Sequence, residues 1–323
     1  MWEETRIPDD MISIPTTEVE GIDRVHHLIL LPDFESAAKL SQSLGSSSKN
    51  ISKNGRPQVR LSGEEIAARV HDLNGMIGPA HAFTPWTSIY AAHNSISSCY
   101  GDETIDMLEL GLSADSGYGS RIADLAHVPF LTNSDAHSPE PAKLGREFTR
   151  IETGSSSPDT EATLDAIRSG NIIMNAGFFP EEGKYNQTAC TRCFTPYSLE
   201  EAEQYHWKCP ADRGRIKKGV HDRAAELSDA PESMRPPYLH IIPLAEIIQR
   251  TLHTCSPTTK KCSELYNSCL SQFGDEISIL TLTPVDEIRI FHQELGDAIA
   301  AFREGRIVLH PGGGGKYGTF ELI

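Results

Sequence analysis

The chain lacks any uninterrupted apolar stretch approaching the roughly 20 residues that a helix needs to cross a bilayer. It also lacks an apolar leader, because the opening residues MWEETRIPDD are polar and acidic. Internal repeats are absent as well. These absences argue against a membrane span, a signal peptide and a repeat array, so we expect a cytoplasmic protein that makes no membrane contact.

Positive charge is scarce. The 323 residues carry 29 Lys and Arg against 45 Asp and Glu, a formal net charge of -16. This balance argues against nucleic-acid binding that is driven by charge over a broad surface. A nuclease is not excluded, because metal ions and a local basic patch can meet a phosphodiester.

The seven cysteines do not form an even, ordered disulfide framework. Cys190 and Cys193 make a C-x2-C pair, and Cys209 follows at the spacing of a zinc ribbon. We expect the other four to be reduced, mainly structural thiols: Cys99, Cys255, Cys262 and Cys269.

Strand and helix patterns alternate over the first half of the chain. Residues 1–24 show no clear periodicity, after which apolar runs predict strands at 25–31, 76–81, 107–110, 128–133 and 171–175. Helical patterns cover 34–44, a segment from the capping-box sequence at 62–65 through 73, and a segment that begins at 158–159. This order favours an α/β fold with parallel pairing.

The character of the sequence changes near residue 178. We expect three domains: an α/β region at 1–178, a small cysteine-containing insert at 179–228, and a mainly helical region at 238–323 that ends in a glycine-rich turn. In the third domain, helices are predicted at 243–251, 258–273 and 286–303, with Gly305 at a helix C-cap.

Metal-binding side chains follow several of the predicted strands. The sharpest pattern is Asp135-x-His137 after an apolar run, since residues i and i+2 at a strand end project to one side. His81 ends another strand, the pair His26-His27 lies within a third, and Glu18 precedes it. Carboxylate and imidazole donors suit zinc, manganese or iron. Taken singly, each residue could instead have an ordinary structural role, as a turn aspartate, a core histidine or a solvated glutamate.

Longer motifs carry a resemblance to a known family. TTE, VHHLILLP, GRP, AHAFTPW, LELGLSAD, LTNSDAHSP, LGREF and FFPEEGKY resemble the PHP domain of endonuclease Q and its relatives. ACTRC, WKCP and RIKKGVHDR resemble the zinc-binding insert of that family, and AFREGRIVLHPGGGGKYG resembles its carboxy-terminal segment. The resemblance implies a distorted (β/α) PHP-type barrel. The family opens with an H-x-H motif that these 323 residues do not contain, so we expect an incomplete barrel and partial metal binding.

The resemblance also implies a set of metal ligands. Matched motif by motif, they are Glu18 as bridging carboxylate, His27, His81, Asp135 and His137, with His26 the less fitting of the two adjacent histidines. Glu18 and Asp135 would be the catalytic carboxylates, and the metal would be zinc, manganese or magnesium. Glu109 lies near the barrel rim, and Phe83, Trp86 and Tyr90 either line a lesion pocket or pack beneath a rim loop.

In the insert, the implied structural zinc would bind Cys190, Cys193, Cys209 and Asp212, with Asp212 at the position of the family's fourth cysteine. The densest basic cluster follows directly, and either a phosphate backbone lies there or it is a solvated face. With the tail lysine, the expected DNA contacts are Arg215, Lys217, Lys218, Arg223 and Lys316, and Arg213 belongs to the same cluster. The glycines at 312–315 either approach a phosphate or form a terminal turn.

Function follows from the resemblance as an expectation. The chain would be a metal-dependent endonuclease that nicks DNA on the 5′ side of deaminated bases or abasic sites, impaired by the missing first metal motif. Two alternatives stay open: a non-catalytic DNA-binding protein on a PHP scaffold, and a PHP phosphatase acting on small phosphate esters. The expected partner is damaged DNA, and whether a sliding clamp or other repair proteins also bind is left open.

Overall fold

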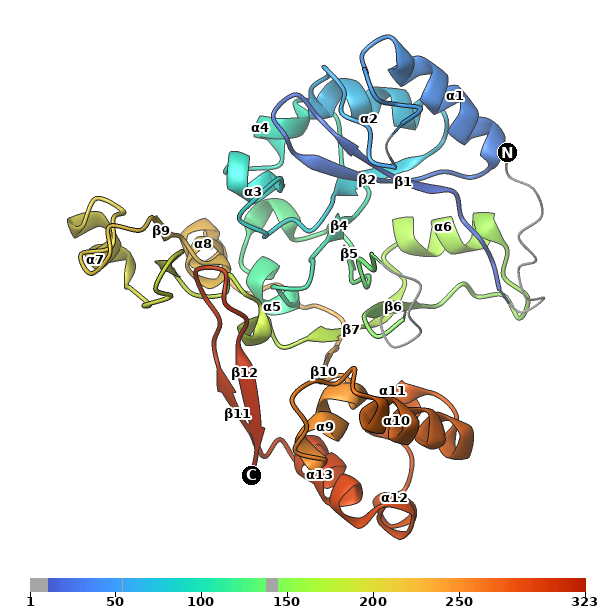
Figure 1. Cartoon of the computed structure of the whole chain (residues 1–323). Helices are drawn as coiled ribbons and strands as arrows, with labels where there is room; N and C mark the ends of the chain where they lie inside the picture. Colours follow the sequence, from blue (N-terminus) through green and yellow to red (C-terminus); the bar gives the residue numbers. More distant parts are fainter. Residues whose placement is uncertain (1–10, 54, 138–144) are drawn as a thin grey trace. The chain divides into compact units, whose positions relative to one another are not determined.

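The computed structural model describes residues 11–53, 55–137 and 145–323 of a mixed α/β chain (Figure 1). Internal contacts divide the chain into two units. Unit 1 comprises Thr149–Asn175, Val220–Tyr238 and the described chain up to Thr132. Unit 2 comprises the described part of 133–148, Ala176–Gly219 and Leu239–Ile323. This division into two units does not test the three consecutive domains expected from the sequence, which stay a prediction.

Unit 1 opens with an antiparallel sheet of order β1-β2-β3. Its strands are β1 (Thr16–Glu20), β2 (His26–Leu30) and β3 (Met76–Pro79). The expected parallel pairing is wrong here, because only residues 21–25 join β1 to β2 and a parallel crossover needs a dozen or more. Parallel pairing does occur between β4 (Leu108–Glu109) and β5 (Phe130–Leu131).

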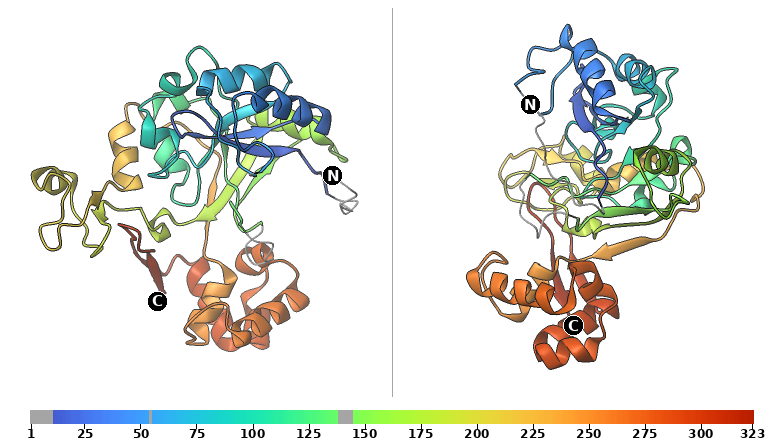
Figure 2. Two further views of the ribbon diagram at one scale, coloured as in Figure 1. Left: turned by 45° about the horizontal axis from the view of Figure 1, so that its top comes forward. Right: turned by 90° about the vertical axis from the view of Figure 1, so that its right-hand side faces the viewer.

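The helices of unit 1 begin where the sequence provides side-chain caps. Asp33, Ser62 and Asp159 cap α1 (Phe34–Gly45), α2 (Gly63–His71) and α6 (Thr160–Arg168). In Figures 1 and 2, α1 and α2 stay beside β1 and β2 in every view. A core beneath the strands joins Leu30, Met76, Met107, Leu131, Leu164 and Ile167. The shorter helices are α3 (Ile89–Ala92), α4 (Ser97–Tyr100), α5 (Ser116–Gly119), η1 (Ala123–Leu125) and α8 (Val220–Leu227).

A second three-stranded sheet has the order β10-β7-β6. It contains β6 (Phe148–Ile151), β7 (Ile172–Phe178) and β10 (Tyr238–Ile241). The chain passes from unit 1 to unit 2 within β7, after Asn175.

The insert of unit 2 is built on short elements: η3 (Pro180–Glu182), β8 (Ala189–Cys190), α7 (Leu199–Gln204) and β9 (Ile216–Lys217). β8 pairs with β9 antiparallel. Cys190, Ala202, Cys209 and Ile216 form its small core, with Tyr197 and Trp207 packed against it. Two of the four core side chains are cysteines, so few purely hydrocarbon side chains stabilise the core of this insert.

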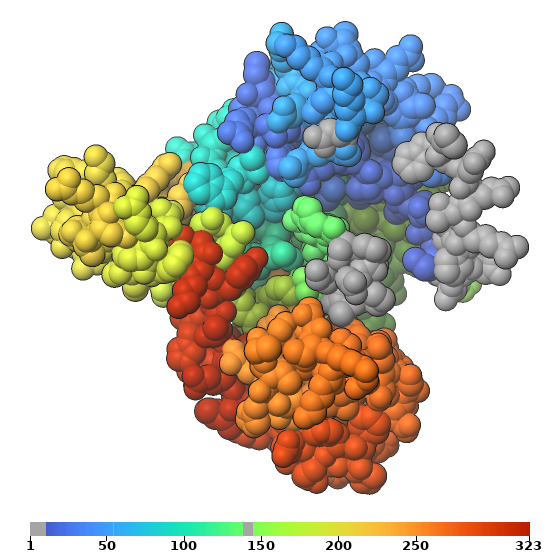
Figure 3. Space-filling model, in the orientation of Figure 1, coloured from blue at the N-terminus to red at the C-terminus, as the bar shows by residue number. Residues whose placement is uncertain are grey.

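The mainly helical carboxy-terminal region is confirmed. It contains α9 (Leu244–Thr251), α10 (Lys260–Phe273), α11 (Glu276–Thr281), α12 (Val285–Phe291) and α13 (Gln293–Arg303) around one apolar core. In Figure 3 this orange-to-red region forms one packed body. The single helix expected at 286–303 is wrong, because His292 is extended and its side chain accepts a hydrogen bond from Leu295 N as the N-cap of α13.

A hairpin that the sequence reading missed closes the chain. It pairs β11 (Ile307–His310) with β12 (Thr319–Leu322), and its connection carries the glycine run. In the described residues, no helix combines the length and apolar character that a membrane span requires.

Candidate metal centre

Glu18, His26 and His81 converge within unit 1. Glu18 Oε1 lies 2.7 Å from His26 Nδ1 and 3.8 Å from His81 Nε2, and the two ring nitrogens are 3.1 Å apart. Two donors bound to one ion at about 2.1 Å each lie roughly 3.0–3.4 Å apart, so these separations fit a shared cation. These three residues form one of the groups with metal-ligand spacing in the described residues. Carboxylate and imidazole donors of this kind suit zinc or manganese.

Neighbouring groups orient the two histidines. Glu20 Oε2 lies 3.3 Å from His26 Nε2, which leaves Nδ1 directed at Glu18. Thr84 Oγ1 lies 3.1 Å from His81 Nδ1, which leaves Nε2 directed into the group. Hydrogen bonds on the outer nitrogen are how metal-binding histidines are held in one tautomer.

Glu109 positions the backbone beneath His81. Its carboxylate is buried and accepts a hydrogen bond from His81 N at 2.9 Å. His81 has a φ of 33°, in the left-handed region, so this bond holds an uncommon conformation. Glu109 therefore supports the turn and is not part of the three-residue group.

The geometry corrects the choice between the adjacent histidines. His26 and His27 point to opposite faces of β2, as neighbouring strand residues do. His27 is fully buried, and its Nδ1 lies 2.7 Å from Tyr100 Oη rather than beside Glu18. His26 is the member of the group, so the assignment of His27 to this site was wrong.

Cationic and imidazole neighbours keep Glu18 ionised. Burial acts to raise the pKa of Glu18, but hydrogen bonds from His26 and His81 outweigh it and hold the pKa well below its usual range. Arg56, from the GRP motif, adds an ion pair at 3.0 Å to Glu18 Oε1. Glu18 therefore presents an anionic oxygen across the neutral pH range, as a metal ligand must.

Asp135 and His137 lie together in unit 2. His137 Nδ1 is 2.8 Å from the Asp135 carbonyl oxygen and 3.9 Å from its carboxylate, and both side chains are exposed. Asp135 has a φ of 43°, so the D-x-H segment leaves the strand conformation. Their part in the metal site stays a prediction. The next two residues of the motif, Ser138 and Pro139, lie outside the described residues.

The four residues expected to bind structural zinc meet in the insert. Cys193 Sγ lies 3.6 Å from Cys209 Sγ, and Cys190 Sγ lies 3.4 Å from Asp212 Oδ1. All four donors fall within 4.8 Å of one another. Arg192 N donates to Cys190 Sγ at 3.3 Å and Tyr197 Oη lies 3.1 Å from Cys209 Sγ, hydrogen bonds of the kind that stabilise thiolates. The donor set of three sulfurs and one oxygen suits zinc.

Comparison with known proteins connects this geometry to a family. A crystal structure of the lesion-specific endonuclease PfuEndoQ from Pyrococcus furiosus is 44% identical, with a TM-score of 0.89 over 95% of this chain and 77% of that one. A second crystal structure holds Endonuclease Q with a 27-mer duplex that has an abasic lesion at the active site. It is also 44% identical, with a TM-score of 0.91 over 95% of this chain and 78% of that chain. This chain belongs to the endonuclease Q family.

Curated relatives of this family member are uncharacterised. The protein YqxK of Bacillus subtilis is 32% identical over 92% of the chain and 74% of its own length. MJ0043 of Methanocaldococcus jannaschii is 44% identical over 75% of the chain, but the match spans only 31% of MJ0043. A family model for the MJ0043 C-terminal domain matches residues 243–306, which contain helices α9 to α13.

The basic residues expected to contact DNA divide into two groups. Arg215 and Lys316 are exposed, as is Arg213. Lys217 is half-buried, which lowers its pKa, and Lys218 Nζ lies 5.4 Å from the centre of the Trp207 ring.

The Arg223 side chain makes hydrogen bonds within unit 1 of this endonuclease Q family member. Its guanidinium donates to the carbonyl oxygens of Tyr90 and His93 at 2.9 and 3.0 Å, and to Asn94 Oδ1 at 2.6 Å. These three acceptors hold α8 to α3 and to the two residues that follow it. The assignment of Arg223 as a phosphate contact is therefore corrected to a structural role.

The glycine run packs inside unit 2. The amides of Gly312, Gly313 and Gly315 donate to the carbonyl oxygens of Glu181, Lys316 and Lys184. In Figure 3 the red hairpin lies against the yellow-green segment. A Cβ at Gly314 (φ +66°) would stand 2.1 Å from the Cys190 carbonyl oxygen, so a side chain cannot replace this glycine without displacement. The run is a packed turn, and those three amides are not directed at a phosphate.

Two of the three aromatic residues after His81 belong to the core. Phe83 and Tyr90 are each 2% exposed, and their ring centres lie 5.0 Å apart. Trp86 is 45% exposed. Packing therefore accounts for Phe83 and Tyr90, which are too buried to receive a flipped base.

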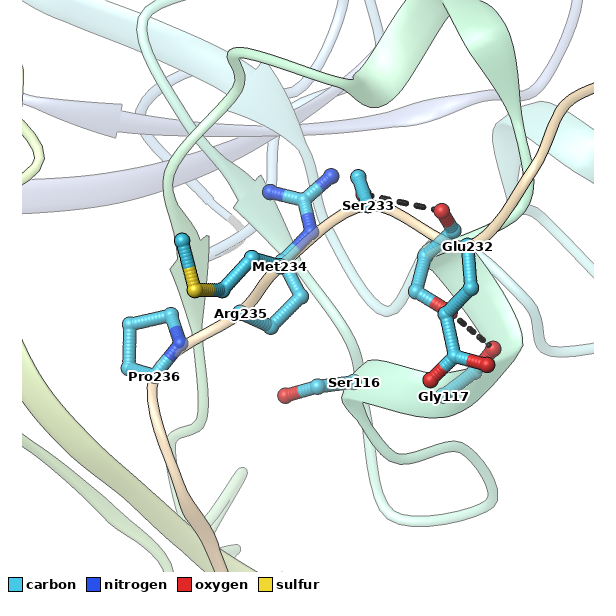
Figure 4. Close-up of a pocket in the computed structure, with 8 residues that line it drawn as sticks. Ser116, Gly117, Glu232, Ser233, Met234, Arg235 and Pro236 are labelled. Atoms are coloured by element: carbon cyan, nitrogen blue, oxygen red, sulfur yellow. Dashed lines mark hydrogen bonds between the residues drawn. The ribbon is translucent and has the colours of Figure 1, made fainter.

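A hollow of about 500 Å³ in unit 1 does not include the metal group (Figure 4). It is lined by Ser116, Gly117, Ser120 and residues 232–236. Glu232 pairs with Arg121 at 3.1 Å, and the Arg235 guanidinium lies 3.8 Å from the Phe130 ring centre. Both charged lining residues are thus used within the fold, and we assign no ligand there.

Sequence reasoning missed Glu20 and Arg56. Glu20 lies two residues after Glu18, and residues i and i+2 of a strand share a face. That spacing was the available signal for a second carboxylate at the site. Arg56 lies in a loop. An isolated β-bridge between Glu20 and Gln58 brings this loop beside β1 and Arg56 beside Glu18, and no local sequence pattern predicts that bridge.

Proposed function

We propose that this chain is a metal-dependent endonuclease that nicks DNA on the 5′ side of deaminated bases or abasic sites. The observation that carries the proposal is the 44% identity over 95% of the chain to a lesion-specific endonuclease, one relative of which holds an abasic duplex at its active site. The Glu18–His26–His81 group gives this likeness a chemical basis.

The chain's residues would act by holding and orienting divalent metal. Glu18 would supply an anionic oxygen, and His26 and His81 would supply neutral imidazole nitrogens kept in place by Glu20 and Thr84. A bound divalent ion would supply Lewis-acid polarisation of a phosphodiester and a lowered pKa for water. Asp135 and His137 are proposed to complete the ligand set, as the family resemblance implies.

DNA contacts are proposed at the exposed cations of unit 2. Arg213, Arg215 and Lys316 are exposed and can approach a phosphate backbone without breaking an internal bond of their side chains. Lys217 and Lys218 flank the same strand end. The cysteine group beside them would fix this segment through structural zinc.

Nicking assays test the proposal. Duplexes carrying deoxyuridine, hypoxanthine or an abasic site are incubated with the chain and Mn²⁺, Mg²⁺ or Zn²⁺, next to an undamaged duplex. We expect one nick 5′ of the lesion, none in the undamaged duplex, and loss of nicking in Glu18→Gln. Two results would overturn the proposal. One is hydrolysis of small phosphate esters without any nick, and the other is binding of the lesion duplex without hydrolysis by both the unmodified chain and Glu18→Gln.

A further inference from the structure

A second group of metal-binding side chains lies on the opposite face of β2 from the Glu18–His26–His81 group. Asp23 follows β1, His93 ends α3, Cys99 lies in α4, and His27 belongs to β2. We propose that Asp23, His27, His93 and Cys99 form a closed transition-metal site, suited to zinc. It is separate from the metal group that carries the proposed nuclease activity.

Three of the four donors already converge. Asp23 Oδ2 lies 2.6 Å from His93 Nε2 and 3.7 Å from Cys99 Sγ. One donor atom from each of these residues falls within 4.8 Å of the other two. Cys99 Sγ donates a hydrogen bond to the same carboxylate oxygen that lies beside His93, so one oxygen of Asp23 joins the three side chains.

The fourth donor is a buried nitrogen without a partner. His27 is fully buried, and its Nε2 has no hydrogen-bond partner in the described structure. A buried polar atom that is left unsatisfied destabilises the fold, so it calls for an explanation. Tyr100 Oη lies 2.7 Å from Nδ1; if Nδ1–H donates to that oxygen, Nε2 is the bare lone pair that a metal needs.

Two glycines show that this nitrogen faces the other donors. A Cβ at Gly21 would stand 3.0 Å from His27 Nε2 and 3.1 Å from Asp23 Oδ1. A Cβ at Gly63 would stand 2.8 Å from Cys99 Sγ and 3.1 Å from His27 Cε1. The nitrogen, the carboxylate and the sulfur therefore border one small space that is kept open by the absence of side chains at 21 and 63.

The chemistry of the donors points to zinc. Two imidazoles, one carboxylate and one thiolate make a four-coordinate set with borderline-soft character, which suits Zn²⁺ and its spectroscopic substitute Co²⁺. Four protein donors leave no open position, as in a structural site. Burial raises the pKa of the Cys99 thiol, so binding an ion would release a proton. Such a site would fix the turn between β1, which carries Glu18, and β2, which carries His26.

Metal content and Co²⁺ absorption test this site independently of nicking. The full chain, Cys99→Ala, His93→Gln and the control Cys255→Ala, an exposed cysteine outside both groups, are loaded with Zn²⁺ or Co²⁺ and desalted. We expect Cys99→Ala and His93→Gln each to lose one metal equivalent. Cys99→Ala is expected to lose one of four thiolate contributions to the Co²⁺ charge-transfer band, while Cys255→Ala matches the unmodified chain.

Equal metal content and equal band intensity in folded Cys99→Ala, His93→Gln and the unmodified chain would overturn the site. If Cys99→Ala does not fold, as judged by circular dichroism, His93→Gln decides, because the His93 side chain is partly exposed. No nicking by the unmodified chain, with one metal equivalent still lost in both Cys99→Ala and His93→Gln, would overturn the nuclease proposal and support this site.

Discussion

Glu20 holds His26 from the side opposite Glu18. Its carboxylate is buried and lies 3.3 Å from His26 Nε2, so it fixes the ring whose other nitrogen faces Glu18. Outer-shell partners of metal-binding histidines typically contribute about 10–100-fold to metal affinity. We therefore expect Glu20→Gln to weaken Mn²⁺ or Zn²⁺ binding by about that factor in calorimetric titration. Glu35→Gln, which breaks only the surface pair with Lys39, is the matched control, and equal affinities in both variants would remove Glu20 from the site.

Asp212 offers a second test on a single residue. Cys190 Sγ lies 3.4 Å from Asp212 Oδ1, so a thiolate at position 212 would close a four-sulfur site of the kind common in structural zinc. Asp212→Cys is expected to slow zinc loss to a chelator, and Asp212→Ala to speed it, in a colorimetric release assay. Identical release by both variants would contradict a zinc ligand at this position.

The residue scale also shows where sequence reasoning stops. The donors were predictable from spacing for His81 and for the three cysteines of the insert, whereas the roles of Glu18 and Asp212 followed from the family resemblance. The choice between His26 and His27 was not, since alternation says that they oppose one another but not which face meets Glu18. Only the packing of Tyr100 against His27 decides that.

Among the elements, α2 depends on its capping box. The Ser62 hydroxyl accepts from Glu65 N at 3.2 Å, and the Glu65 carboxylate accepts from Ser62 N at 2.9 Å. Loss of such a cap costs about 1 kcal/mol. Ser62→Ala is expected to lower the free energy of unfolding by that amount in urea denaturation. Ser41→Ala, at an exposed position inside α1, should leave it within about 0.5 kcal/mol, and equal effects would show that the cap contributes nothing.

Helix starts were predictable where a cap residue precedes an apolar period, as at Asp33, Ser62 and Asp159. The break at His292 was not, because the apolar pattern continues across it from α12 into α13. The pairing of β1 with β2 was also missed, since β1 has only five residues and a mixed composition. At His292 a local N-cap hydrogen bond starts a new helix, and the apolar period alone does not mark that start.

At the scale of unit 2, the buried Glu147 and the half-buried Glu182, Glu246 and Glu276 lie near the Arg146 guanidinium. Burial and then the neighbouring Glu246 raise the pKa of Glu182 to about 8, and burial raises that of Glu147 to about 7 despite Arg146. Burial likewise raises the pKa of Glu246 and of Glu276. A carboxyl with a raised folded-state pKa contributes stability that is present below its unfolded value of 4.5 and is lost as pH rises through the folded value.

The thermal midpoint of the chain should therefore fall as the pH rises from about 5 to about 8, by roughly 2–4 °C for each kcal/mol lost. Glu182→Gln is expected to reduce this slope, because the neutral amide does not titrate. Differential scanning calorimetry across this range measures both proteins. A slope that the substitution leaves unchanged would show that Glu182 is not among the groups responsible.

The account as a whole depends on a cation shared by Glu18, His26 and His81. Anomalous diffraction from crystals of the chain soaked in Mn²⁺ tests this most directly. We expect a peak about 2.0–2.3 Å from Glu18 Oε1, His26 Nδ1 and His81 Nε2. A well-ordered structure would contradict the account if these three atoms lay apart with no peak between them. It would also do so if His27 replaced His26 as a ligand of the ion bound by Glu18.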